Sequence, residues 1–135
     1  MGLDMYVEIV EDDFFTDAVS KPKEFDSNEQ FFYWRKHPNL HGWMLKLYEK
    51  KGGTNNFNCE YVELTKKDIL DLYKAIMKNK LPHTAGFFFG ESPTEKELVD
   101  YIDQVQEDLN FIKKALEFFD DPEYEGKHLM YTSWW

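Results

Sequence analysis

Residues 92–119 form the longest amphipathic segment of the chain and constrain its fold most strongly. Ser92, Pro93 and Glu95 have the pattern of a helix start: a capping residue, a proline in the first turn and a glutamate three positions after the cap. Apolar residues then recur at steps of four and three positions, at Leu98, Ile102, Val105, Leu109, Ile112 and Leu116. This heptad spacing predicts a helix to about Phe119, whose seam packs either on a sheet of the same chain or on a second copy in a homodimer.

Shorter patterns before and after this segment predict the remaining elements. Apolar alternation predicts a strand over 3–9. Ring-rich or apolar runs predict further strands over 31–36, 59–64, 87–89 and 128–134. Helical spacing predicts one helix from Pro38 to the glycine pair 52–53 and another over 65–80, the latter opened by a Thr65–Asp68 capping pattern. The order predicts a single α+β domain over 1–135, with a mixed or mostly antiparallel sheet of about five short strands and three helices, the last one long.

The charge of the chain is concentrated near its C-terminal end. Between Glu91 and Glu125 there are twelve acidic residues and three lysines, so this stretch carries −9 of the net charge of −10. Such a surface disfavours direct nucleic-acid or membrane binding and suits a partner with a basic surface. The acidic residues expected to face that partner are Glu97, Asp100, Asp103, Glu107 and Asp108. A solvated helix face that keeps the protein in solution is the simpler alternative.

The single arginine of the chain, Arg35, lies inside its densest aromatic run. Arginine stacks on rings and binds carboxylate or phosphate through two parallel hydrogen bonds, so it marks a possible site for a small anionic ligand. In a strand, Arg35 shares a face with Phe31 and Tyr33. Asp4 is a possible structural partner for it. The candidate ligand-binding residues are Arg35, Trp34, Tyr33, His41, Trp43, Phe88 and Asp4.

Other reactive residues give weaker patterns. His37 and His41 are four positions apart, but Pro38 lies between them and no third ligand follows at a telling spacing, so we expect no metal site and no cofactor. We expect His37 to cap a helix. The lone Cys59 excludes an intrachain disulfide and is expected to be a small buried residue in a strand. The acidic segment 11–29 predicts a long loop whose role stays open.

Several segments together resemble a family of small, largely uncharacterised proteins from phages and bacterial genomes. They are 1–6 (MGLDMY), 33–36 (YWRK) followed by His41 and Trp43, 86–90 (GFFFG) and 131–134 (YTSW). Members are sometimes labelled phosphoglycerate kinase, a label that this short chain without a nucleotide-binding loop does not support. The resemblance implies a phage-type accessory protein and supplies no catalytic residues.

These observations favour a non-enzymatic binding protein that modulates a host process such as defence. Its partner would be a host protein with a basic surface, bound by the acidic helix, or a small anionic ligand bound by Arg35 and nearby rings. The alternatives are a small enzyme acting on a phosphate- or carboxylate-bearing compound, with Arg35 as a clamp and His41 as general base, or a homo-oligomeric structural protein. No run approaches the roughly 18 apolar residues of a membrane span, and the start lacks a secretory signal. We therefore expect a cytoplasmic protein, in the host cytosol if a phage encodes it.

Overall fold

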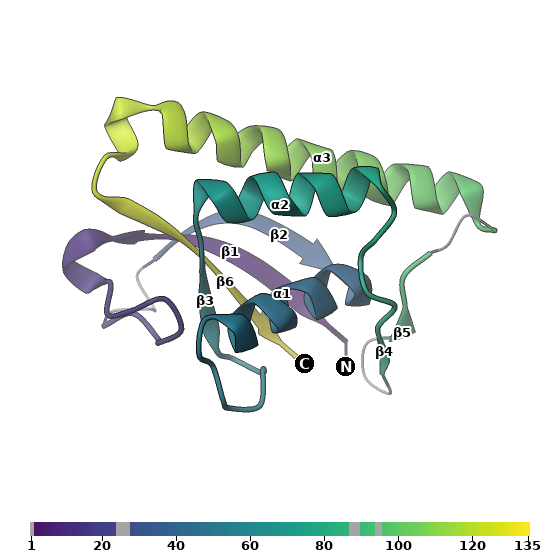
Figure 1. Ribbon diagram of the computed structural model, residues 1–135, viewed down its shortest axis with the longest axis horizontal. Helices are drawn as coiled ribbons and strands as arrows, with labels where there is room; N and C mark the ends of the chain where they lie inside the picture. Colours follow the sequence, from purple (N-terminus) through teal and green to yellow (C-terminus); the bar gives the residue numbers. More distant parts are fainter. Residues whose placement is uncertain (1, 24–27, 87–89, 94–95) are drawn as a thin grey trace.

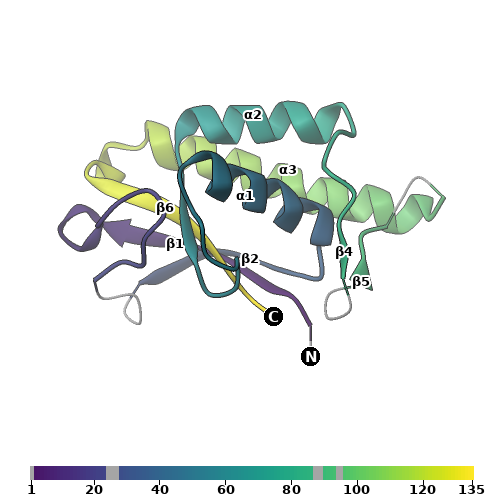
Figure 2. The same ribbon diagram turned by 60° about the horizontal axis from the view of Figure 1, so that its bottom comes forward.

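The computed structural model describes residues 2–23, 28–86, 90–93 and 96–135, and it confirms the α+β class (Figure 1). The sheet has four antiparallel strands in the order β2-β1-β6-β3: β1 (Asp4–Glu11), β2 (Glu29–Arg35), β3 (Tyr61–Leu64) and β6 (Lys127–Trp134). The helices are α1 (Pro38–Lys50), α2 (Lys66–Met77) and α3 (Leu98–Asp120). All three lie on the same face of the sheet, and α3 is the longest (Figure 2).

The predicted strand 87–89 lies outside the described residues. Two short strands on either side of it, β4 (Ala85–Gly86) and β5 (Gly90–Glu91), pair with each other and stay separate from the main sheet. The main sheet therefore has four strands, where the sequence predicted about five.

Strand β1 confirms the alternation read from the sequence. Met5, Val7 and Ile9 are buried and belong to the core between the sheet and the helices. Tyr6 and Glu8 are half-buried and point to the opposite, outer face, because successive side chains of a strand alternate. β1 lies between β2 and β6, so its inward side chains lie at the centre of the core.

A β-bulge in β2 changes the direction of one predicted side chain. Val7 of β1 lies opposite Phe32, and the next residue, Glu8, lies opposite Gln30, so Phe31 has no partner across the strands. Phe31 turns into the core, where it packs edge-on against Phe118, with 5.6 Å between ring centroids. The prediction that Phe31 shares a face with Tyr33 and Arg35 was therefore wrong, because an uninterrupted alternation does not allow for a bulge.

The segment after β1 covers part of the outer face of the sheet. A short helix, η1 (Asp12–Phe14), follows β1, and Phe14 and Phe15 pack against a small outer cluster of Val10, Tyr61 and Met130. The ring of Phe15 stacks on the imidazole of His128 at 3.9 Å between centroids. His128 in turn bonds the Asp12 carboxylate at 2.9 Å and the Glu63 carboxylate at 2.7 Å. His128 thus fastens the beginning of the predicted 11–29 loop to the sheet.

This attachment predicts a pH dependence of stability. Burial alone lowers the pKa of His128, but the hydrogen bonds and charges of Asp12 and Glu63 outweigh it, and the net pKa is raised above its usual 6.5. The folded state therefore binds the His128 proton more tightly than the unfolded state. The added stability is fully present below about pH 6.5 and is lost as the pH rises through the higher folded pKa.

We expect His128→Gln to lower the free energy of unfolding at pH 6 by about 1 kcal/mol or less, because the pair is partly exposed to solvent. The difference from wild type should shrink as the pH rises above 6.5, measured by urea unfolding at a series of pH values. A difference that stays constant across this range would show that the charge of His128 does not hold the segment.

The helix boundaries confirm one capping prediction and correct another. Thr65 and Asp68 form the predicted capping box at the start of α2. Ser92 does not open the last helix, which begins at Leu98. Its hydroxyl instead accepts the backbone N–H of Asn39 at 3.0 Å, in the first turn of α1, where the N-cap residue itself makes no side-chain cap. Ser92 therefore caps α1 from a distant part of the chain.

Cys59 also differs from its prediction. It is exposed, has a positive φ of 64° and precedes β3, which begins at Tyr61. The expectation of a buried cysteine within a strand was wrong, because the strand is shorter at this end than the sequence pattern suggested.

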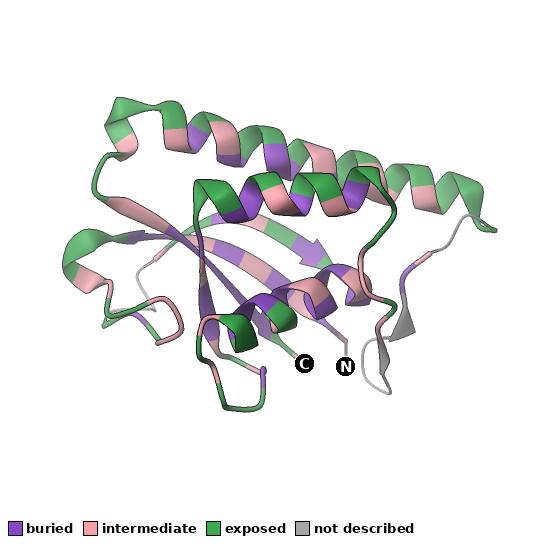
Figure 3. Cartoon of the chain, in the orientation of Figure 1, coloured by how far each residue is buried: buried purple, intermediate pink, exposed green. Residues whose placement is uncertain are grey.

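The apolar seam of α3 has two different halves (Figure 3). Ile112 is buried, and Val105, Leu109 and Leu116 pack against the core, so the second half of the seam lies on the same chain. Leu98 and Ile102, in the first half, are exposed, and Figure 1 shows that this part of the helix projects past the end of α2. Among the described residues, none of the helices combines the length and the apolar character needed to cross a membrane.

Candidate functional site

Asp108 is a buried carboxylate at the centre of a hydrogen-bond network between α3 and β2. It was predicted to face a basic partner, but it is only 2% exposed and cannot do so. One of its oxygens, Oδ1, accepts the indole N–H of Trp34 at 3.1 Å, and the other, Oδ2, lies 2.8 Å from Nε2 of His37. A buried carboxylate needs such donors to replace the water it loses. This geometry explains why an acid stands on the inner side of the helix.

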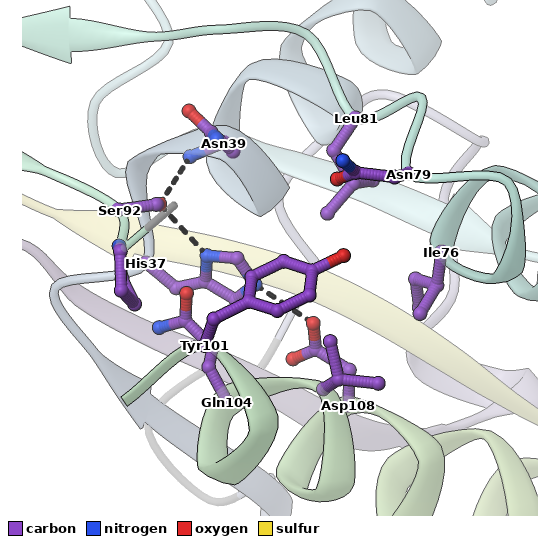
Figure 4. Close-up of a pocket in the computed structure, with 11 residues that line it drawn as sticks. His37, Asn39, Ile76, Asn79, Leu81, Ser92, Tyr101, Gln104 and Asp108 are labelled. Atoms are coloured by element: carbon purple, nitrogen blue, oxygen red, sulfur yellow. Dashed lines mark hydrogen bonds and ion pairs between the residues drawn. The ribbon is translucent and has the colours of Figure 1, made fainter. Parts of the chain in front are cut away.

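The network continues from His37 to Ser92 (Figure 4). An ionised carboxylate only accepts hydrogen bonds, so Nε2 of His37 carries the hydrogen that faces Asp108. In the neutral imidazole, Nδ1 is then an acceptor, and the Ser92 hydroxyl, 3.0 Å away, donates to it. All three side chains are buried. The arrangement is an ordered chain of carboxylate, imidazole and hydroxyl with one consistent set of donors.

A cavity of about 120 Å³ lies beside this network and is partly open to solvent. This volume exceeds what one water molecule needs and fits a molecule of only a few heavy atoms. His37, Ser92 and Asp108 all line it, together with polar and apolar side chains from α1, α2, α3 and the segment after α2: Asn39, Asn79, Tyr101, Gln104, Ile76, Leu81 and Val105. In Figure 4, dashed lines mark the contacts that link Ser92, His37 and Asp108 among the residues that line this space.

Sequence reasoning assigned these three residues to other roles. His37 was expected to cap a helix, and it is the N-cap residue of α1, although its side chain makes no capping hydrogen bond there. Ser92 was expected to open the last helix, and Asp108 to face a partner. Asp108 did carry a signal, because it falls three positions after Val105 and four before Ile112, on the inner side of the helix. An acid at an apolar position usually has a buried partner. The pairing with His37 and Ser92, far away in the sequence, had no such signal.

Arg35 lies on the outer face of the sheet, away from this cavity. Asp4 is its direct neighbour across β1 and β2, and the closest approach, from Nε of Arg35 to Oδ1 of Asp4, is 4.0 Å. The same Asp4 oxygen accepts the Tyr33 hydroxyl at 2.6 Å, and this hydrogen bond is the main reason that the pKa of Tyr33 is raised. Arg35 therefore has the neighbour that the sequence suggested, but over a distance too long for a hydrogen bond.

The other predicted ligand-binding residues do not join Arg35. Trp34 is buried on the inner face, where it bonds Asp108. His41 and Trp43 belong to α1, on the same inner side of the sheet. Phe88 lies outside the described residues. The structure thus places the predicted residues on two sides of the sheet, with Asp4, Tyr33 and Arg35 together on the outer one.

His41 is not suited to the role of general base near Arg35. Its Nδ1 lies 2.8 Å from the Tyr131 hydroxyl, and its ring packs against Phe57 and Trp135. Burial lowers its pKa to about 4, so it is neutral at physiological pH. The sheet also separates it from Arg35.

The predicted acidic surface remains at the first turns of α3, without Asp108. Glu97, Asp100, Asp103 and Glu107 are exposed there. Three apolar side chains lie between them, Leu98, Val99 and Ile102, with exposed fractions of 58%, 72% and 54%. We call these three apolar residues together with Glu97, Asp100 and Asp103 the α3 tip. Within the described residues, no group of His, Cys, Asp and Glu side chains is placed to hold a metal ion.

In comparisons with models of known families, with curated proteins and with solved structures, no match to this chain was found. The two features of the fold that indicate a function are the α3 tip and the cavity beside Asp108.

Proposed function

We propose that this protein is a binding protein that docks the α3 tip on another protein. The observation that carries the proposal is the exposure of Leu98, Val99 and Ile102, each more than half accessible to solvent. Large apolar side chains gathered at one place on a surface are typical of an interaction site. Of the eight large apolar side chains that are exposed in the described part of the chain, six are on α2 and α3, so this exposure is concentrated on the helices.

The chemistry of the α3 tip indicates the kind of partner. Its apolar residues fit an apolar groove, as when an amphipathic helix lies in the groove of its receptor. Glu97, Asp100 and Asp103 surround them, and the stretch 91–125 that contains α3 carries −9 of the net charge of −10. The complementary partner is a protein whose groove is edged by lysine and arginine. The resemblance to small phage proteins extends this proposal to a host protein whose activity the binding modulates.

The proposal is tested by capture from a lysate with the immobilised protein at about 0.05 M and 0.5 M salt. Exposed charges are screened over about 10 Å at 0.1 M salt and over shorter distances above it, so we expect partner capture to fall at high salt. The control is the double variant Val99→Ser/Ile102→Ser, which removes apolar surface and leaves the acids in place.

A protein held by wild type at low salt, and lost both at high salt and by the double variant, supports the proposal. A protein held equally by both forms, or equally at both salt concentrations, contradicts it. The oligomeric state is measured in parallel. A wild-type dimer that the double variant dissociates would show that the α3 tip binds a second copy of the chain, and it would also contradict the proposal.

A further inference from the structure

We propose that Ser92, His37 and Asp108 form a catalytic relay in which Ser92 attacks the carbonyl carbon of a small acyl ester. This activity is separate from partner binding by the α3 tip, whose apolar side chains are exposed to solvent, whereas the side chains of the relay are buried. The proposal depends on three observations: the order of the hydrogen bonds, the position of Ser92 at a helix N-terminus, and the cavity beside it.

The hydrogen bonds have the order that activates a hydroxyl nucleophile. The distances of 3.0 Å from Ser92 to His37 and 2.8 Å from His37 to Asp108 fall within the range typical of a nucleophile, its base and the group that orients the base. Trp34 holds the second oxygen of Asp108, so the carboxylate cannot turn away from the imidazole. In the neutral imidazole, Nδ1 of His37 is then the acceptor for the proton of Ser92.

The N-terminus of α1 favours negative charge at the Ser92 oxygen. This helix has 13 residues, and the N–H of Asn39 in its first turn donates to Ser92 Oγ at 3.0 Å. The first turn of a helix carries partial positive charge and unpaired N–H groups, which stabilise an anion nearby. As Ser92 loses its proton, the growing charge on Oγ therefore lies where the backbone already favours it.

The cavity supplies space for a small substrate. Ser92 and His37 both line the space of about 120 Å³, which suits an acyl group of acetyl size. The amides of Asn39 and Gln104 also line it. The side-chain amide oxygen of Asn39, Oδ1, accepts the Thr84 N–H at 2.8 Å. The NH₂ group of the same amide is therefore the end that can donate a hydrogen bond. Such amide donors are suited to the oxygen of a tetrahedral intermediate.

The reaction balances with water as the only co-reactant. A bond forms between Ser92 Oγ and the acyl carbon, the bond from that carbon to the leaving alcohol oxygen breaks, and His37 carries the Ser92 proton to the leaving oxygen. Water then attacks the acyl carbon and gives one proton through His37 back to Ser92. The products are a carboxylic acid and an alcohol, and no oxidation occurs.

The test uses the intact folded protein with two small probes. Methanesulfonyl fluoride should sulfonylate Ser92 with loss of fluoride, detected as one added group by intact mass and located by peptide mapping. p-Nitrophenyl acetate should be hydrolysed with turnover. We expect Ser92→Ala and His37→Gln to lower the hydrolysis rate by about 100-fold or more, the usual contribution of a nucleophile's base. Ser20→Ala, which changes a half-buried serine that bonds Asp17 and lies outside the cavity lining, is the matched control and should match wild type.

Because Ser92 also caps α1, its substitution can weaken the fold, so the labelling of wild type decides the question. Ser92 labelled in the folded protein, with hydrolysis lost in Ser92→Ala, supports the relay. A folded wild type without label on Ser92 and without turnover overturns it and leaves Ser92 as a helix cap only. Hydrolysis that persists unchanged in Ser92→Ala overturns it equally.

Discussion

Replacing Asp108 with alanine is expected to lower the free energy of unfolding by about 2–6 kcal/mol, because a buried donor that loses its acceptor costs about 1–3 kcal/mol and Asp108 serves two of them. The carboxylate bonds both Trp34 and His37, which come from the strand and the turn below α3. Without it, the indole N–H and the imidazole N–H stay buried and lose their acceptors. The loss is measured by urea unfolding, followed by tryptophan fluorescence.

Asp103→Ala is the matched control, because it removes an exposed carboxylate from the same helix. We expect its unfolding free energy to stay within about 0.5 kcal/mol of wild type. Asp108→Asn keeps the shape of the side chain, and its unfolding free energy should lie between those of Asp108→Ala and Asp103→Ala. Equal, small effects of Asp108→Ala and Asp103→Ala would show that the network does not hold α3 on the sheet.

The second large effect is expected for partner binding by the α3 tip. Ile102→Ser should weaken the complex by about 2 kcal/mol or more, or roughly 30-fold in Kd, if Ile102 lies at the centre of the interface. It should leave the unfolding free energy nearly unchanged, because Ile102 is 54% exposed in the free protein. Binding is measured by titration of the captured partner, and folding by thermal unfolding of the same sample.

Leu70→Ser on α2 provides the control for this prediction. It removes a large apolar side chain of comparable exposure, 41%, from the neighbouring helix. We expect wild-type affinity for this variant. If both variants weaken binding to the same extent, the interface is not confined to the α3 tip.

The charges of the α3 tip have a separate role. Replacing Asp103 with lysine should slow association and reduce the salt dependence of the affinity, while dissociation changes less, because exposed charges act mainly on the approach of two proteins. Replacing the apolar residues of the α3 tip should instead speed dissociation and change the association rate less. The charge variant thus reports on the association rate, and the apolar variants report on the dissociation rate.

Local patterns predicted most of the fold. The alternation along β1, the capping box at Thr65 and the end of α3 near Phe119 were all readable, because each depends on residues close together in the sequence. The bulge at Phe31 and the true start of α3 were not. The bulge depends on the pairing of β2 with β1. The start of α3 depends on Ser92, whose hydroxyl accepts a backbone N–H in the first turn of α1.

The sequence predicted the candidate site less well than the fold. It indicated the acidic exposed part of α3 and the proximity of Arg35 and Asp4, since composition and strand register are local properties. It did not show that Asp108 turns inward while Asp103 stays outside. That difference follows from the side of α3 on which each residue falls, and the partners His37 and Ser92 come from distant segments of the chain.

Hydrogen–deuterium exchange of the protein with and without its captured partner tests the central claim most directly. The first turns of α3 project past α2, so their amides should exchange readily in the free protein. We predict that the partner slows exchange over residues 98–107 and leaves the outer strand residues around Arg35 unchanged. Unchanged exchange over 98–107 in the complex, with protection elsewhere, would contradict the assignment of the α3 tip as the binding surface.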